Sequence, residues 1–285
     1  MEITEDVLNK IRRLKPRQRR LAMKEVGKLE WEKCARDIFY WLDAKRHELL
    51  GEYVFTKDPH PMYKCITCGE VSADYKMTDR EKHLTLAHGL EIEGEEALRG
   101  AFIEQDTTRA FPFYLPYMRP IIEWWLREPI ICLEKSRDMT ATWVTVTCYT
   151  WDTIFHKGRE NIFQSEDASK TLDLVERASF IYRNQPRFLR DIHPANFTVG
   201  AGKSGRLTVP SLESVLLGFP QGPDQIRQYH PSGVFQDEAA YQISAGDAFM
   251  SIKPAIQNGG RFTAVSSANP SWFYHACRDT LESLI

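Results

Sequence analysis

The chain has 285 residues, of which 42% are hydrophobic and 27% are charged, and its formal net charge is −2. This size and composition predict one large α/β domain with a smaller module, and the near-neutral charge excludes the strongly basic balance of a histone-like protein. No run approaches the roughly 20 apolar residues of a membrane span, and the charged start of the chain lacks the apolar core of a signal peptide, so we expect a cytoplasmic protein with no membrane partner.

Residues 1–60 are predicted to form a helical arm. The apolar pattern of residues 5–14 predicts a short helix that breaks at Pro16, and a second helical pattern runs from about residue 17 to residue 41. Seven basic residues crowd the junction of the two: Arg12, Arg13, Lys15, Arg17, Arg19, Arg20 and Lys24. Such a charge run is suited to docking on phosphates or on another protein, and an ordinary solvated basic face is the alternative.

Residues 61–105 contain the spacing of a zinc-finger-like module. Cys65 and Cys68 precede a turn residue, Gly69, and His83 and His88 follow on a predicted helix. Two thiolates on a tight turn and two imidazoles on one helix face can close a tetrahedron around Zn²⁺. Accidental spacing of free thiols and surface histidines is the alternative. Acidic residues within the motif favour a structural or docking role over the reading of nucleic-acid bases.

The region from residue 130 to residue 142 indicates a phosphate-binding loop. An apolar run at residues 130–133 predicts a strand, and a helical pattern follows Thr142. A strand that turns sharply into a helix offers backbone N–H groups and the positive end of the helix dipole to phosphates, with a hydroxyl left for Mg²⁺. Thr142 is placed for that hydroxyl. Thr140 and Ala141 stand where Gly-Lys is usual, and Lys135 and Arg137 are the replacement cations.

Two adjacent carboxylates, Asp237 and Glu238, end a mostly apolar segment further along the chain. One such acid can hold Mg²⁺ while its neighbour polarises the water that attacks a phosphate. An ordinary pair of strand-end carboxylates that caps a helix is the alternative. A further β-prone run, residues 261–270, delivers the hydroxyls of Ser266 and Ser267, for which a plain turn is the alternative. The order of loop, acids and hydroxyls is typical of an open α/β sheet, whose ligands bind beyond the carboxyl ends of its strands.

Two smaller features bear on this domain. The pair Trp124 and Trp125 is predicted to lie on the buried face of a helix, with stacking on a nucleotide base as the alternative. The Gly-Lys-Ser of residues 202–204 imitates a phosphate loop, but Thr198-Val199 makes a poor strand before it and no helix follows. We therefore interpret residues 200–205 as a connection between strands.

With these motifs, the sequence from about Phe111 to Phe273 resembles the ATPase domain of the large terminase subunit, the DNA-packaging motor of tailed bacteriophages. Lys135, Ser136, Arg137 and Thr142 fit the family's variant phosphate loop, residues 113–120 look like its adenine-side segment, and residues 164–168 are a further match. The resemblance implies a P-loop NTPase fold of the RecA/ASCE type over residues 106–285: a mostly parallel sheet flanked by helices.

The resemblance also implies a set of site residues. ATP is expected on Lys135, Ser136, Arg137, Asp138, Met139, Thr140, Ala141 and Thr142. Thr142 and Asp237 are expected to hold Mg²⁺, with Glu238 activating water and Arg137 assisting in catalysis. Ser266, Ser267 and Ala268 resemble the family's coupling motif, which passes the hydrolysis state on to DNA movement.

The expected partners follow from the same resemblance. They are double-stranded DNA, the portal protein, the small terminase subunit and further copies of the chain in a five-membered ring, in the host cytoplasm. The C-terminal nuclease domain is expected to be absent, as in an ATPase-domain fragment or a split subunit. The alternatives are a zinc-containing scaffold that binds nucleotide or DNA without hydrolysis, and a superfamily-2 helicase-like fragment, for whose second domain the chain has no room.

Overall fold

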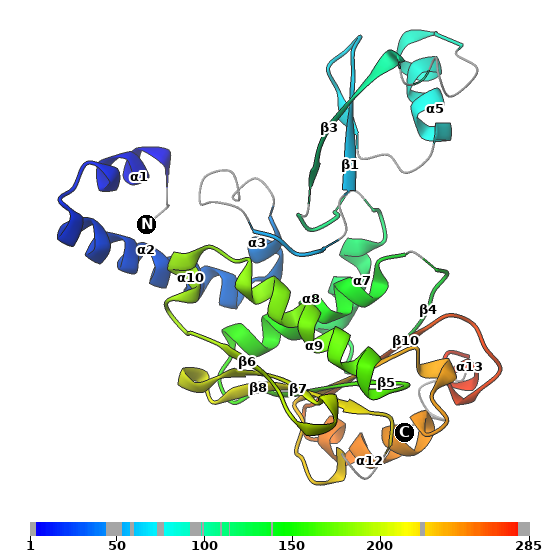
Figure 1. Ribbon diagram of the computed structural model, residues 1–285. Helices are drawn as coiled ribbons and strands as arrows, with labels where there is room; N and C mark the ends of the chain where they lie inside the picture. Colours follow the sequence, from blue (N-terminus) through cyan, green and yellow to red (C-terminus); the bar gives the residue numbers. More distant parts are fainter. Residues whose placement is uncertain are drawn as a thin grey trace.

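The structure of the protein is a computed structural model, and it describes residues 4–43, 53–57, 60–72, 77–91, 98, 100–108, 110–113, 115–137, 139–222 and 226–278. Figure 1 shows a helical arm at the N-terminal end, a small module of strands with one helix, and a larger domain built on a sheet. The larger domain holds most of the residues that the sequence singles out for nucleotide chemistry.

A seven-stranded sheet forms the centre of the larger domain, in the order β4-β10-β9-β5-β8-β7-β6. Its strands are β4 (Ile130–Glu134), β5 (Glu160–Ser165), β6 (Asn196–Val199), β7 (Gly205–Val209), β8 (Ser214–Pro220), β9 (Gly233–Asp237) and β10 (Arg261–Ser266). The first five strands of that order run parallel, β7 is antiparallel to β8, and β6 is antiparallel to β7. The predicted α/β fold with a mostly parallel sheet is confirmed.

Helices cover both faces of this sheet (Figure 1). One face carries α7 (Met118–Arg127), α8 (Ala141–Phe155), α9 (Ala168–Arg183) and α10 (Arg187–Arg190), and the other carries α12 (Ala245–Gln257) and α13 (Trp272–Ala276). Each face has its own hydrophobic core. The central strands are therefore buried on both sides, which explains their near-continuous apolar sequences.

Short 3-10 helices complete the domain, namely η1 (Ala201–Lys203), η2 (Pro210–Leu212) and η3 (Ala239–Tyr241). The first of these connects β6 to β7, so residues 200–205 join two strands as predicted. The judgement that Thr198 and Val199 make a poor strand was wrong, because both pair with β7 at the edge of the sheet. The prediction for Trp124 was also wrong: Trp125 is buried at 2% exposure, whereas Trp124, the preceding residue of α7, is 46% exposed.

The N-terminal arm consists of α1 (Glu5–Arg12), α2 (Pro16–Arg36) and α3 (Ile38–Leu42). The predicted second helix of residues 17–41 is thus two helices. Asp37 divides them, since its backbone is extended and its carboxylate accepts a hydrogen bond from the N–H of Phe39 as the N-cap of α3. The break at Pro16 is as predicted, with the proline in the first turn of α2.

The small module contains a three-stranded antiparallel sheet and one long helix. The strands lie in the order β2-β1-β3, with β1 at His60–Cys65, β2 at Val71–Ser72 and β3 at Phe102–Thr108, and the helix α5 spans Met77–His88. Its small core includes Cys65, Leu84 and Phe102. No helix in the described part of the chain has the length and hydrophobicity needed to cross a membrane.

Candidate functional site

The loop between β4 and α8 carries the residues predicted to bind phosphate. It leaves the sheet at Lys135, whose N–H donates to the carbonyl of Ser266 at 2.9 Å. It enters α8 through Thr140, which has φ 55° and ψ 10° in the left-handed region. That backbone geometry costs a non-glycine residue on the order of 1–2 kcal/mol. The first N–H groups of α8, from Ala141 onward, therefore face the loop at the positive end of the helix.

The acid pair lies beside this loop because three parallel strands end at the same edge of the sheet. Ser266 at the end of β10 is in register with Glu134 of β4, and Val265 is in register with Asp237 of β9. The chain then turns at Glu238, which also has a positive φ of 51°. Three described non-glycine residues have a positive φ, and two of them, Thr140 and Glu238, belong to this site.

Two side-chain contacts join the loop to the acids. The hydroxyl of Thr142 donates to Oδ1 of Asp237 at 3.0 Å. The ammonium of Lys135 lies 2.9 Å from Oε1 of Glu238, with 12% and 29% of the two side chains exposed. Lys135 and Thr142 therefore each contact a different acid of the pair.

The second carboxylate oxygen of Glu238 faces the end of β10. Oε2 accepts from the hydroxyl of Ser266 at 3.2 Å and lies 3.5 Å from both the N–H and the hydroxyl of Ser267. The hydroxyl of Ser266 also accepts from the N–H of Ala240 at 3.1 Å. The predicted coupling residues Ser266 and Ser267 thus touch Glu238 directly, and Ala268 follows them in the segment after β10.

The pKa values of the two acids are shifted in opposite directions. Burial raises the pKa of Asp237 to about 6 and the charge of Glu238 adds to this, although the Thr142 hydrogen bond and the cations Arg177 and Lys135 act against it. For Glu238, burial also raises the pKa, but the hydrogen bond and charge of Lys135 outweigh it and hold the pKa below its ordinary value. Glu238 is therefore the acid that stays ionised most readily, as a hydrogen-bond acceptor must.

A cleft of about 430 Å³ opens next to these residues. Arg137, Asp237, Glu238 and Ser267 line one side of it. Ser165 and Glu166 come from the segment of residues 164–168, which the resemblance also singles out. The rest of the lining was not predicted from the sequence: Lys170, Asp173, Leu174, Arg177 and Tyr241. Four of these lie on α9 at the spacing of one helix face, and this periodicity is the signal that sequence reasoning could have used.

The side of the cleft formed by α9 is rich in charge. Lys170 forms a hydrogen-bonded ion pair with Glu166, which raises the pKa of that lysine. Arg177 stands over the ring of Trp143, 5.0 Å from its centroid, and its charge reaches Asp237. Arg137 and Arg177 therefore place two guanidinium groups on the lining of one cleft, and guanidinium groups pair well with phosphate oxygens.

The remaining predicted loop residues lie at varied depths. Ser136 is exposed, Met139 is half-buried and Ala141 is 3% exposed at the start of α8. Asp138 lies outside the described residues. The predicted adenine-side segment packs elsewhere: Phe113 contacts Phe111 and Phe39, and Arg119 stands over the Phe39 ring. Among the described residues that line the cleft, none comes from this segment.

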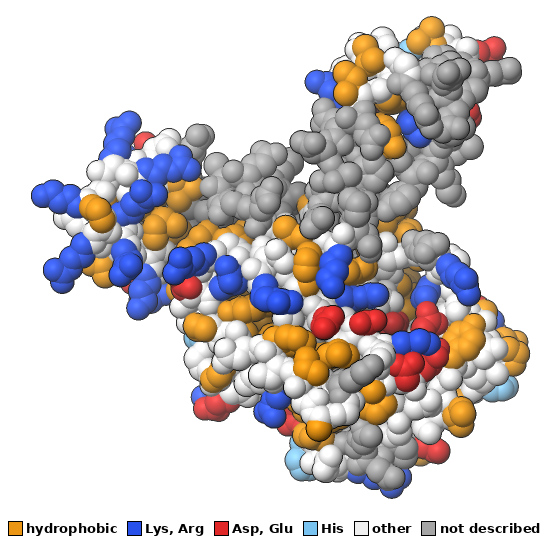
Figure 2. All heavy atoms as spheres, viewed as in Figure 1, with side chains coloured by type: hydrophobic (Ala, Val, Ile, Leu, Met, Phe, Trp, Pro, Cys, Tyr) orange, Lys and Arg blue, Asp and Glu red, His pale blue; other side chains and the backbone are white. Residues whose placement is uncertain are grey.

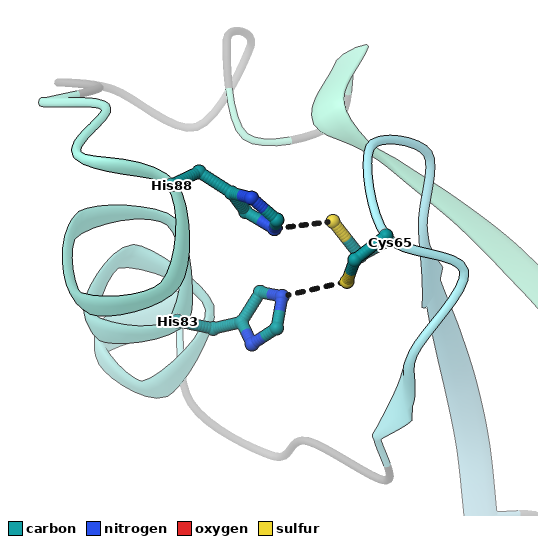
Figure 3. A group of neighbouring side chains, drawn as sticks. Cys65, His83 and His88 are labelled. Atoms are coloured by element: carbon teal, nitrogen blue, oxygen red, sulfur yellow. Dashed lines mark hydrogen bonds between the residues drawn. The ribbon is translucent and has the colours of Figure 1, made fainter.

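The four predicted zinc ligands meet in the small module. The ligand atoms of Cys65, Cys68, His83 and His88 all lie within 4.8 Å of one another. Sγ of Cys65 is 3.5 Å from Nε2 of His88, and Sγ of Cys68 is 3.4 Å from Nε2 of His83. Figure 3 shows the two histidines pointing from one helix, α5, toward the turn that carries Cys65. The spacing has therefore produced a cluster of two sulfur and two nitrogen donors.

The turn that carries the cysteines is built for thiolates. Gly69 takes a φ of 75°, and the N–H of Glu70 donates to Sγ of Cys68 at 3.4 Å. Burial raises the pKa of Cys65, but N–H groups of Cys68 and Thr67 and the His83 ring outweigh it and bring this pKa down to about 6. Two sulfurs and two imidazole nitrogens are the donor set of structural zinc, so the residues present fit that metal.

No protein-family model matches this sequence, and no curated protein sequence does either. Among solved structures, the chain is similar to the large terminase ATPase domain of Thermus phage P74-26, with 14% identity and a TM-score of 0.38 over 51% of this chain and 62% of that one. It is similar to the large terminase of bacteriophage HK97, with 12% identity and a TM-score of 0.43 over 57% of this chain and 34% of that one.

A third similar structure is the large terminase of the thermophilic bacteriophage D6E in complex with ADP. The identity is 14% and the TM-score 0.40, over 59% of this chain and 42% of that one. The chain thus spans less than two thirds of the length of each of these three proteins. All three are phage large terminases, the proteins that the sequence motifs resemble.

Proposed function

We propose that the larger domain is the ATPase motor of a phage large terminase, which hydrolyses ATP to drive double-stranded DNA into a procapsid. One observation carries the proposal. The ends of three parallel strands and the start of α8 bring Lys135 onto Glu238 and Thr142 onto Asp237 beside a charged cleft. A cation, a metal-binding hydroxyl and two carboxylates with separate partners are the parts that phosphoryl transfer to water needs.

The residues present fit a magnesium ion. Thr142 Oγ1 and Asp237 Oδ1 are hard oxygen donors only 3.0 Å apart, and Mg²⁺ takes one or two such protein ligands together with water and phosphate oxygens. Thr142 and Asp237 would hold the ion, which when bound neutralises charge on the phosphate oxygens. Burial raises the pKa of Asp237, and a bound cation would favour the ionised carboxylate.

The other residues act on the phosphates and on water. Lys135 and the exposed Arg137 supply positive charge at the mouth of the loop, and Arg177 supplies it from α9. Glu238, ionised and held by Ser266 and Ser267, orients a water molecule and accepts its proton. Because Lys135 and the two serines contact the same carboxylate, the position of Glu238 depends on both the loop and the end of β10.

The small module is proposed to bind zinc through Cys65, Cys68, His83 and His88. The ion would hold the β1–β2 turn to α5, which otherwise share a core of few residues. A module of this size gains most of its folding energy from such a metal. Its role is structural or in docking.

The partners proposed from the resemblance are double-stranded DNA, the portal protein, the small terminase subunit and other copies of the chain in a ring. They extend the ATPase proposal to a packaging assembly. Binding of the purified chain to each of these partners can be measured separately.

The test is release of inorganic phosphate from ATP by the purified chain, with and without Mg²⁺. Hydrolysis should require Mg²⁺ and should fall about 10²-fold in Thr142→Val, which removes the hydroxyl at little change in volume. Thr150→Val is the matched control, because Thr150 lies on the same helix and donates to the Val146 carbonyl. Binding of ATP without any turnover would contradict the ATPase and favour the non-hydrolysing scaffold.

A further inference from the structure

The arm carries a concentration of positive charge that the ATPase site does not use. Between residues 7 and 24 the sequence has no acidic residue, although the whole chain has a net charge of −2. The basic residues in this stretch are Lys10, Arg12, Arg13, Lys15, Arg17, Arg19, Arg20 and Lys24. Figure 2 shows Lys and Arg side chains gathered over α1 and the start of α2, where the arm projects from the larger domain.

The C-terminal half of α2 is fixed to the larger domain. The Trp151 indole donates to the Cys34 carbonyl at 2.7 Å, and Trp31 packs against the ring of Phe155. Gly27 allows the close approach of α2 to α10, since a Cβ there would lie 2.7 Å from the Phe188 carbonyl oxygen. Because α2 is one continuous helix, these contacts of its C-terminal half also fix the direction of its N-terminal half, which projects from the larger domain.

The N-terminal half of α2, which projects from the larger domain, forms a helical hairpin with α1, and the charged side chains lie on the outside of this hairpin. Leu8 and Ile11 of α1 pack on Val26 of α2, so the apolar side chains face inward. Arg17, Arg20 and Lys24 follow at i, i+3 and i+7 and form one exposed stripe of α2. Among the described residues none of these three has an ion-pair partner, in contrast to Lys10 with Asp6 and Lys28 with Glu25.

We propose that this stripe, Arg17, Arg20 and Lys24, binds the phosphate backbone of duplex DNA. Three cations spaced about 5–6 Å apart along a helix face form a positive row that suits the phosphate backbone of a duplex, whose two strands together carry one charge per about 1.7 Å of axis. The stretch from Lys10 to Lys24 has no aromatic residue, whereas protein interfaces are enriched in aromatic side chains and depleted in lysine. The choice of DNA over an acidic protein also rests on the proposed function.

The experiment measures DNA binding by fluorescence anisotropy with a labelled duplex of about 30 base pairs over a range of salt concentrations. The stripe variant is Arg17→Ala, Arg20→Ala and Lys24→Ala, which keeps good helix formers on α2. The control variant is Arg127→Ala, Lys157→Ala and Arg206→Ala, three exposed cations outside the arm, so the two variants have the same net charge. Circular dichroism establishes that both variants are folded.

The stripe variant should lower the slope of log K against log salt by about 3 and weaken binding about 10- to 100-fold at low salt, because each phosphate contact contributes close to one unit of slope. In the control variant, the change in the salt slope and the change in affinity should each be at most about a third of the change in the stripe variant. Equal loss in both variants, or an unchanged slope in the stripe variant, overturns the proposal. A second titration uses poly-L-glutamate as a model of an acidic protein. If the stripe variant loses binding to poly-L-glutamate while its DNA binding is unchanged, the proposal is also overturned.

Hydrolysis of ATP without DNA, measured on the same samples, separates this proposal from the proposed function. The stripe residues lie far from the cleft residues in sequence and are not among the described residues that line the cleft, so the stripe variant should hydrolyse ATP at the native rate. If no sample hydrolyses ATP, the ATPase proposal fails. The DNA titration still shows whether the stripe binds duplex DNA.

Discussion

The ammonium of Lys135 lies 2.9 Å from a carboxylate oxygen of Glu238, 103 residues further along the chain. The contact joins the phosphate-binding loop to the acid that we propose orients water. An ammonium has three donors, so Lys135 can contact a phosphate oxygen while it holds Glu238. The position of the acid is thereby linked to whatever occupies the loop.

Replacing Lys135 by methionine should weaken ATP binding about 10- to 100-fold, since the loss of one charged hydrogen bond in a partly buried site costs roughly 1.5–3 kcal/mol. A titration with a fluorescent ATP analogue measures this. Lys157→Met, at a lysine whose side chain is 70% exposed, is the control and should bind as the native chain does. Native affinity in Lys135→Met would exclude this lysine from the nucleotide site.

The raised pKa of Asp237 predicts an unusual pH dependence of stability. This carboxyl has a pKa of about 6 when folded, against an ordinary value of 3.8. Between these pH values the folded state holds a proton that the unfolded state has lost, so the free energy of unfolding falls as the pH rises and levels off above the folded pKa.

The variant Asp237→Asn lacks this titration. Relative to the variant, the native chain should lose up to about 3 kcal/mol of unfolding free energy between pH 4 and pH 7. Urea unfolding of both proteins at a series of pH values, without divalent cations, measures the difference. A difference that stays constant over this range would show that Asp237 is not titrating there.

Thr140 and Glu213 share a φ of 55°, one in the phosphate-binding loop and one in an exposed turn. Glycine at either position should relieve the left-handed strain and raise Tm by about 2–4 °C, the equivalent of roughly 1 kcal/mol. Thr140→Gly should also lower ATP turnover, because the loop loses a fixed backbone angle, and Glu213→Gly should not. A lower Tm in Thr140→Gly would mean that the threonine side chain stabilises the folded state by more than the left-handed backbone destabilises it.

The purified chain should contain about one zinc ion per molecule, and Cys68→Ser should remove it. Loss of the metal should increase amide exchange in α5 while β9 and β5 remain protected, because the module has its own small core. Cys277→Ser, outside the Cys/His cluster, is the control and should keep its zinc. Full zinc content in Cys68→Ser would exclude the proposed ligand set.

Much of the fold and part of the site could be predicted from the sequence because the signals are local. The apolar run before Lys135, the acids after a buried strand and the spacing of Cys65 to His88 each depend on neighbouring residues alone. Parallel strands that end at one edge then bring these segments together.

What sequence reasoning missed depends on strand order and on faces. Lys170 and Arg177 belong to the cleft because β5 lies beside β9, which places the following helix α9 next to the acids. The periodicity of the sequence shows that Lys170 and Arg177 share one face of a helix, but it does not show which part of the protein that face contacts. Trp124 was misplaced for a related reason, since α7 buries Trp125 and turns its neighbour to solvent.

The most direct test of the account compares ATP binding and ATP hydrolysis in the native chain and in Glu238→Gln at equal zinc content. Glutamine keeps the size of the side chain and removes its charge, so ATP should still bind while the steady-state rate with Mg²⁺ falls about 10²–10³-fold. Glu134→Gln, which changes an exposed acid at the end of β4, should hydrolyse at the native rate. Undiminished hydrolysis by Glu238→Gln would contradict the role given to this acid and, with it, the proposed site.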